Sequence, residues 1–189
     1  LTDALDEKMR LIDEIATPVL ESVMNVSKED RVRHNTKIWI PEINDHLMGH
    51  QVVAVALDTG NQGNIKKLLL GEGWADPEVE AELTIDNAQL QAVLAHMNKN
   101  DWELVQKIWD QMELLYPQLA EVHRRTTGLV PPKVQATEVN TPYGTFKGGY
   151  YPVKYSPRRS RKAEKNAEKR EAETESMFNN TASIQSSVN

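Results

Sequence analysis

The longest hydrophobic pattern in this chain lies at residues 101–128. Its apolar side chains recur at steps of three and four, which places them on one face of a helix of roughly seven turns. They are Trp102, Val105, Ile108, Trp109, Met112, Leu115, Leu119 and Val122. A helix with one continuous apolar face needs neighbours to cover it, so we expect the rest of the chain to be organised around this segment.

Both ends of this helix have recognisable signals. Asn100 or Asp101 can accept hydrogen bonds from the first turn, and Gly128 can adopt the left-handed conformation that closes the last turn. Pro117 removes one backbone donor from the middle. We therefore expect one helix with a kink near 110–113 rather than two separate helices.

The chain before this helix repeats the helical spacing in shorter segments. The first segment is amphipathic and is interrupted by Pro18; its apolar positions are Leu5, Met9, Ile12, Ile15, Val19, Leu20 and Val23. Ser27, with Asp30 three residues later, can cap a second helix, and Pro41 is expected to end it. The pattern predicts helices over 1–26, 27–40, 41–57, 65–70 and 85–97.

The pattern changes after residue 128. Residues 134–139 alternate as a strand does, 141–144 favour a turn, and 145–155 can return as the second strand. We expect a β-hairpin over about 133–155 whose aromatic side packs on the helices, because a single hairpin is marginally stable alone. The predicted aromatic core consists of Trp102, Trp109, Tyr150 and Tyr151. Gly148 and Gly149 indicate a bulge or a close approach of backbones.

These patterns predict a mainly α fold: an irregular antiparallel helical bundle with the hairpin packed on it. The predicted module covers 1–155. Residues 156–178 are almost entirely charged or small and are expected to form a solvated, charged helix, and 179–189 form a polar linker or tail.

Composition narrows the function classes. At 189 residues the chain can bury one ordinary core. It has no cysteine, which excludes disulfides, thiolate metal sites and cysteine nucleophiles. Its net charge of −6 argues against a general nucleic-acid coat, and the apolar run near 52–57 is far too short for a membrane span. The first residue is Leu1 rather than methionine, which suggests a segment of a longer polypeptide.

Candidate catalytic and metal sites are weak. His46 and His50 have the spacing that lets two imidazoles on one helix meet a metal ion, but no third ligand is fixed by spacing. Acidic residues such as Glu78, Glu80 and Glu82 stand beside no catalytic pattern. We therefore expect no catalytic residue, no metal and no cofactor in this segment.

Residues 57–64 contain two glycines and two asparagines, which can end one helix and cap the next. A structural corner between helices is the favoured interpretation. The alternative is a phosphate-binding loop at a helix start, although the lysine and hydroxyl of a P-loop are missing.

Aromatic side chains and positively charged side chains alternate after residue 142, as they do in proteins that bind single-stranded nucleic acid. The candidate contacts with nucleic acid or another anionic partner are Lys147, Lys154, Arg158, Arg159, Arg161 and Lys162. The alternative is that the tyrosines pack on the tryptophans while the cations remain solvated.

Several fragments in order resemble a conserved module of very large bacteriophage proteins. They are Leu57-Asp58-Thr59-Gly60-Asn61-Gln62-Gly63-Asn64, Lys67-Leu68-Leu69, Gly73-Trp74, Asp101-Trp102, Val105-Gln106-Lys107-Ile108-Trp109-Asp110, Gly144 and Gly148-Gly149-Tyr150-Tyr151-Pro152-Val153-Lys154-Tyr155. The module resembles segments of phage polyvalent proteins and of giant podovirus virion proteins, including virion RNA polymerases and ejected internal proteins. The resemblance covers about 47–161.

The resemblance implies a non-catalytic structural and interaction module of a large phage virion protein. Such a protein is packaged in the particle interior and delivered with the genome into the envelope or cytoplasm of the bacterial host. Its expected partners are other virion or ejection proteins, or further copies of itself. The alternative is a nucleic-acid-binding module of a polyvalent protein or virion RNA polymerase. The resemblance assigns no catalytic residue to this segment.

Overall fold

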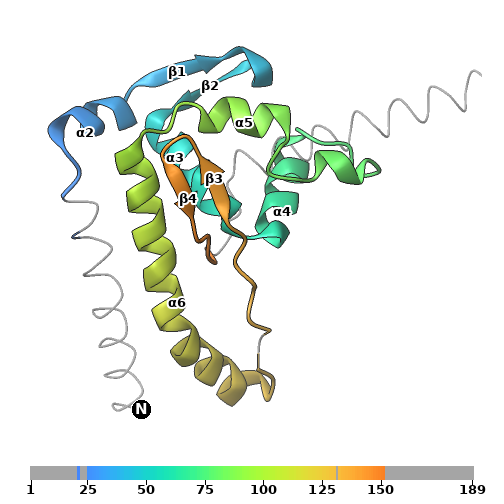
Figure 1. Ribbon diagram of the computed structural model, residues 1–189. Coiled ribbons are helices and arrows are strands. Elements are labelled where there is room, and N and C mark those ends of the chain that lie inside the picture. Colours follow the sequence, from blue (N-terminus) through green and yellow to red (C-terminus); the bar gives the residue numbers. More distant parts are fainter. Residues whose placement is uncertain (1–20, 22–24, 131, 152–189) are drawn as a thin grey trace, which may run out of the picture.

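The computed structural model describes residues 21, 25–130 and 132–151 of this chain. This part is mainly helical with two short antiparallel hairpins, as predicted (Figure 1). The α-helices are α2 (Lys28–His34), α3 (Gly49–Leu57), α4 (Gln62–Glu72), α5 (Ala88–Leu94) and α6 (Lys99–Thr127). The strands are β1 (Lys37–Ile40), β2 (Asp45–Met48), β3 (Val139–Thr141) and β4 (Gly144–Phe146). Single 3₁₀ turns lie at Pro41–Ile43, Asp58–Gly60 and Glu80–Glu82.

Helix α6 is the longest element, and its ends are capped by side chain and glycine. Asn98 accepts a hydrogen bond from the Asp101 backbone N–H (2.9 Å), and the Asp101 carboxylate accepts from the Asn98 N–H (3.0 Å). The expectation that Asn100 or Asp101 would be the cap was wrong by two or three residues, because Asp101 is instead the acidic partner in the first turn. Gly128 closes the helix with φ 75°, which confirms the predicted end.

Pro117 lies inside α6 without ending it, as predicted. The axis of α6 bends in its second half, which is drawn in olive in Figure 1. This second half extends away from the other helices, whereas the first half lies against them.

The core forms where α3, α4, α5 and the first half of α6 meet. Helix α3 contacts both α5 and α6. The most completely buried side chains include Val52, Ala56, Ile65, Leu69, Leu90, Val93, Val105 and Trp109. They come from all four helices, so the predicted helical spacing does place apolar faces together.

The predicted helix over 27–40 was wrong in its second half. Helix α2 ends at His34, and β1 and β2 form a hairpin with Ile40 opposite Asp45. The alternation of exposed and inward residues in β1 and the left-handed Asn44 (φ 48°) favour a hairpin. The predicted helix over 41–57 was therefore wrong in its first half, since α3 begins only at Gly49. Gly49 lies so close to α2 that a Cβ there would meet the backbone of Arg33 and His34.

The second hairpin is shorter than the predicted 133–155. Strands β3 and β4 pair Val139 with Phe146, and the Phe146 ring stacks on Trp102 with centroids 5.7 Å apart. The hairpin therefore packs on α6, as expected. Its ladder stops because the backbone N–H groups of Thr137 and Gly149 both donate to Gly60 rather than across the hairpin.

Some sequence-based expectations fall outside the described residues: the interruption at Pro18, the charged helix over 156–178 and the tail over 179–189. In the part of the chain that the structure describes, no helix combines the length and the hydropathy needed to cross a bilayer.

Candidate functional site

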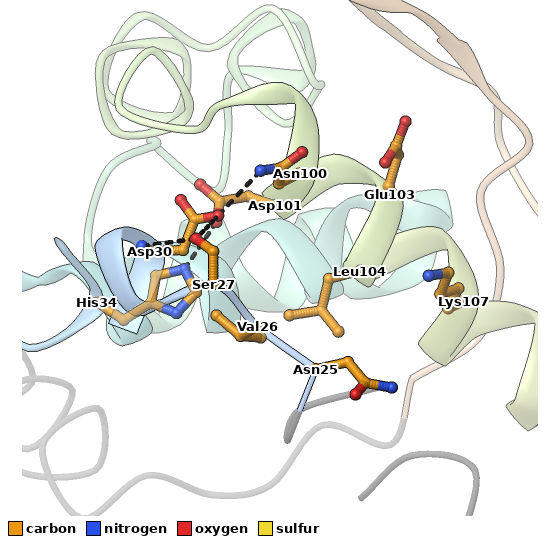
Figure 2. A pocket seen from close by; sticks show the side chains of 10 residues that line it. All are labelled: Asn25, Val26, Ser27, Asp30, His34, Asn100, Asp101, Glu103, Leu104 and Lys107. Atoms are coloured by element: carbon orange, nitrogen blue, oxygen red, sulfur yellow. Dashed lines mark hydrogen bonds and ion pairs between the residues drawn. The ribbon is translucent and has the colours of Figure 1, made fainter. Parts of the chain in front are cut away.

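A pocket of about 250 Å³ lies where the start of α2 meets the first turns of α6. Figure 2 shows the side chains of Asp30, Asp101 and His34 directed toward one another at one side of it. The lining residues are Asn25, Val26, Ser27, Asp30, His34, Asn100, Asp101, Glu103, Leu104 and Lys107. We call Asp30, Arg33, His34 and Asp101 the α2–α6 cluster.

Asp30 is 6% exposed and is surrounded by donors. The amides of Asn98 (2.9 Å) and Asn100 (3.0 Å), which lie at the start of α6, donate to its carboxylate. The Ser27 hydroxyl and the Arg33 guanidinium donate as well, each at 3.0 Å. Asp30 therefore fastens α2 to the start of α6 while remaining charged.

These bonds change the acidity of Asp30. The hydrogen bond from Asn100 has the largest effect, and further bonds from Asn98, Arg33 and Ser27 act in the same direction against the opposing effect of burial. Together they hold the pKa of the Asp30 carboxyl far below its ordinary value.

Asp101 is even more completely buried, with 1% of its surface exposed. Its Oδ1 lies 2.6 Å from Arg33 Nη2 and 2.7 Å from His34 Nε2. Its other oxygen accepts the Asn98 backbone N–H. Arg33 thus bridges two buried carboxylates, which offsets the cost of removing them from water.

The α2–α6 cluster does not have the arrangement of a catalytic triad. A buried carboxylate does orient the His34 ring, as in general-base pairs. The Ser27 hydroxyl, however, donates to Asp30. Both carboxylates use their oxygens to hold donors of this same chain. The geometry is that of a brace between two helices.

Sequence reasoning did not single out this cluster. It identified Ser27, Asp30 and Asp101 only through their capping signals, and Asp101 lies 68 positions from Arg33. A capping pattern indicates that a carboxylate is at a helix start. It does not indicate that two helix starts meet, so no local signal could have found the pairing.

A second set of contacts involves residues 57–64, the loop between α3 and α4. The Gly60 carbonyl accepts from the backbone N–H groups of Thr137 and Gly149, both at 2.9 Å. The Asn61 amide donates to the Gly149 carbonyl (3.2 Å), and the Asn64 amide donates to the Tyr151 carbonyl (2.7 Å). The Trp109 indole N–H donates to the Leu57 carbonyl at 3.0 Å. We call this arrangement the Gly60 clamp.

The glycines of the Gly60 clamp allow backbones to touch. A Cβ at Gly60 would collide with the carbonyl of Gly149, and a Cβ at Gly149 would lie 2.5 Å from Trp109 Cβ. The predicted close approach at Gly149 is therefore confirmed. Asn61 is 1% exposed and caps α4 while its amide holds Gly149, so its polar groups serve the chain itself, as in the favoured corner interpretation.

The predicted aromatic core needs one correction. Trp102 and Trp109 are buried, and Tyr151 packs half-buried against the core, where burial and then the charge of Asp58 raise the pKa of its phenol. Tyr150 is exposed and does not belong to the core. The Gly60 clamp holds the backbone on both sides of Tyr150, through the carbonyls of Gly149 and Tyr151.

Among the predicted cationic contacts, Lys147 is exposed, and its backbone N–H donates to the Gln106 side chain (2.9 Å). The others lie outside the described residues: Lys154, Arg158, Arg159, Arg161 and Lys162.

The histidines lie on different elements. His46 is on β2, with its ring 4.7 Å from that of Trp39, and His50 is on α3. The expectation of both on one helix was wrong because α3 begins after His46. Within 21, 25–130 and 132–151, no group of three or more potential ligands could hold a metal ion.

No protein-family model, curated protein or solved structure matches this chain.

Proposed function

We propose that this chain is a non-catalytic interaction module of a large phage virion protein, packaged in the particle and delivered with the genome. One observation carries the proposal: the buried polar groups most suited to chemistry, in the α2–α6 cluster and the Gly60 clamp, hold distant parts of the chain together. A module built in this way presents a fixed surface to other proteins.

The charge distribution favours protein partners for the described part. Residues 25–151 carry 12 lysines and arginines against 17 aspartates and glutamates. A surface with excess negative charge repels the phosphates of nucleic acid. Contacts of this part with other virion or ejection proteins, or with copies of itself, fit this charge better than contact with DNA.

The second candidate is nucleic-acid binding through the C-terminal part. Residues 152–189 carry 8 lysines and arginines against 5 acids, the reverse of the preceding part. This segment follows directly from Tyr151, and Lys147 is exposed close to the same point in sequence. Such a segment could bind phosphates while residues 25–151 remain a scaffold.

A titration with labelled DNA at several salt concentrations separates the two candidates. The interaction module should bind weakly and without a steep salt dependence. If the second candidate holds, reversing charge at Arg158, Arg159 and Arg161 to glutamate should weaken binding and flatten the salt slope.

A matched control reverses the same number of charges elsewhere. Lys28, Lys37 and Lys67 are exposed on α2, β1 and α4. Equal loss of binding in this control would mean that net charge alone governs the interaction, and the second candidate would then be rejected.

A further inference from the structure

A second pocket, of about 150 Å³, lies between β3 and the C-terminal end of α5. In Figure 1 the turn of the orange β3–β4 hairpin lies beside the link between α5 and α6. The pocket has a helix side, two buried side chains at the link and a strand side, which together are Gln91, Leu94, Ala95, Met97, Trp102, Val139, Asn140, Thr141, Pro142 and Tyr143. We call this pocket the β3–α5 groove.

Strand β3 contributes its edge to this groove rather than one of its faces. All three of its residues, Val139, Asn140 and Thr141, line the groove. On the face of a sheet, only every second residue of a strand is present. The backbone of β3 is therefore part of the groove wall.

The backbone of Asn140 points away from β4. Thr141 and Gly144 form the last pair before a two-residue turn, so they are a hydrogen-bonded pair. Hydrogen-bonded and non-hydrogen-bonded pairs alternate along an antiparallel ladder, which makes Asn140 and Thr145 a non-hydrogen-bonded pair. In the part of the chain that the structure describes, neither the N–H nor the C=O of Asn140 bonds to a loop or a helix. This edge therefore offers one donor and one acceptor to another strand.

The rest of the groove suits an apolar side chain. Leu94, Met97 and Trp102 are each less than 10% exposed, and stacking on Phe146 holds the Trp102 ring in place. A cavity of about 150 Å³ holds a group as large as benzene. None of the lining residues is charged. An uncharged aliphatic side chain thus fits beside the free edge of β3.

We propose that the β3–α5 groove binds an extended peptide segment of a partner protein, which adds as a strand to the edge of β3 and inserts one aliphatic side chain. An extended backbone presents an N–H and a C=O together, and its side chains alternate, so it meets both requirements of the groove.

Charge indicates the flanks of this partner segment. Glu138 is exposed and directly precedes β3, and residues 25–151 carry more acidic than basic side chains. Lysine or arginine on either side of the aliphatic residue complements this charge.

The groove deepens the proposed function, because it names one surface through which an interaction module binds a protein. It rests on the interaction part of that function and not on packaging in a particle. Failure of peptide binding and absence of the chain from particles are therefore separate results.

Titration of the full chain with labelled peptides tests the groove. The probes are capped heptapeptides Lys-Thr-Thr-X-Thr-Thr-Lys in which X is Leu, Ile, Met or Asp, followed by fluorescence anisotropy. We expect the best aliphatic peptide to bind about ten-fold more tightly than the Asp peptide, because a charge in this apolar groove loses its hydration. Methylation of the three central amides should weaken the best peptide about ten-fold, since it removes the donor for the Asn140 carbonyl. Equal binding of all four peptides, or no effect of methylation, would overturn strand addition.

A proline scan of the two hairpin edges locates the binding edge. Asn140→Pro removes the free N–H of β3, and Thr145→Pro removes the corresponding N–H on the opposite edge. Neither N–H belongs to the ladder, so the hairpin tolerates both changes, and both lose the same bond between Thr145 Oγ1 and Asn140 Oδ1. We expect Asn140→Pro to weaken the best peptide about ten-fold and Thr145→Pro to leave it within two-fold. Equal weakening in the two variants would contradict binding at β3.

A variant outside the hairpin keeps the test decisive if proline disturbs the fold. Ala95 is exposed at the end of α5, and Ala95→Leu fills the groove from the helix side. His96→Leu adds the same side chain next to it, outside the groove lining. We expect about ten-fold weaker binding in the first variant and unchanged binding in the second, whereas the same affinity in both would refute the groove as the site.

Sedimentation of the full chain examines the other occupant. A dimer that Asn140→Pro dissociates and Thr145→Pro preserves would assign the edge of β3 to a second copy of the chain, and the proposal of a separate partner would then be wrong.

Discussion

The α2–α6 cluster and the Gly60 clamp both join α6 to distant parts of the chain, but they do so by different physics. The cluster uses two buried carboxylates, Asp30 and Asp101, neutralised by the partly buried Arg33 between them. The clamp uses backbone groups brought together where side chains are absent, at Gly60 and Gly149. The first should therefore be sensitive to charge and pH, and the second to volume.

Loss of charge in the cluster should give the largest effect. Asp101→Ala removes one of the two carboxylates that Arg33 bridges, takes away the partner of His34 Nε2 and removes the cap contact with Asn98. Because the substitution breaks a buried ion pair and removes a helix cap at the same time, we expect the free energy of unfolding to fall by about 4 kcal/mol in a urea titration.

The matched control for Asp101→Ala is Glu103→Ala on the same turn of α6. Glu103 is exposed, with a Lys99 contact at 3.7 Å, so its loss should change stability by less than about 0.5 kcal/mol. Similar effects of the two substitutions would show that the cluster is not a brace.

Added volume in the clamp should give the next largest effect. The new methyl group of Gly149→Ala meets the side chain and backbone of Trp109, so we expect a loss of about 3 kcal/mol by the same titration. Gly71→Ala is the control, since a Cβ there has nothing within 4 Å and lies in α4. Gly71→Ala should be neutral or stabilise the protein by about 1 kcal/mol. If Gly149→Ala proved as stable as Gly71→Ala, close packing at the clamp would be refuted.

Removal of one hydrogen bond from the clamp should cost less. Trp109→Phe loses the indole donor and leaves the buried Leu57 carbonyl without it. We expect thermal unfolding to report a loss of about 2 kcal/mol. Trp39→Phe is the comparison, because Trp39 is half exposed on β1 and its replacement should have little effect.

The pH dependence of stability also distinguishes the two regions, and its expected effect per pH unit is the smallest of those considered. The pKa of Asp30 is lowered by folding, so its stabilising contribution is fully present above the ordinary aspartate pKa of about 4 and decreases as pH falls toward the folded pKa. Below pH ~4, the chain should lose up to about 1.4 kcal/mol per pH unit from this group.

Denaturation of Asp30→Asn across the acidic range measures this contribution. The variant should lose less stability than the unsubstituted chain over the same interval, whereas Glu29→Gln, on the exposed side of α2, should follow the unsubstituted chain. A parallel acid response in Asp30→Asn would contradict the assigned charge state.

Local signals predicted α6, its end at Gly128 and the cap at Ser27, because each depends on residues within one or two turns. The hairpin of β1 and β2 was missed because the cap at Ser27 suggested that its helix would continue to Pro41. The predicted close approach at Gly149 was correct, but its partners were not predictable: Gly60 and Trp109 are distant in sequence.

The α2–α6 cluster illustrates the limit most clearly. Asp30 and Asp101 each follow a cap in a familiar pattern, and the sequence indicates their places at two helix starts. Their common partner Arg33 depends on how α2 and α6 meet. Both helices contact α3, so this meeting is set by tertiary packing rather than by any local pattern.

Cross-linking mass spectrometry of purified phage particles from the source tests the central claim most directly. The proposed function predicts peptides of this chain within one very large virion protein, with lysine cross-links from exposed positions such as Lys28 and Lys37 to other virion proteins. Absence of these peptides from particles, together with their presence in infected cells, would contradict it.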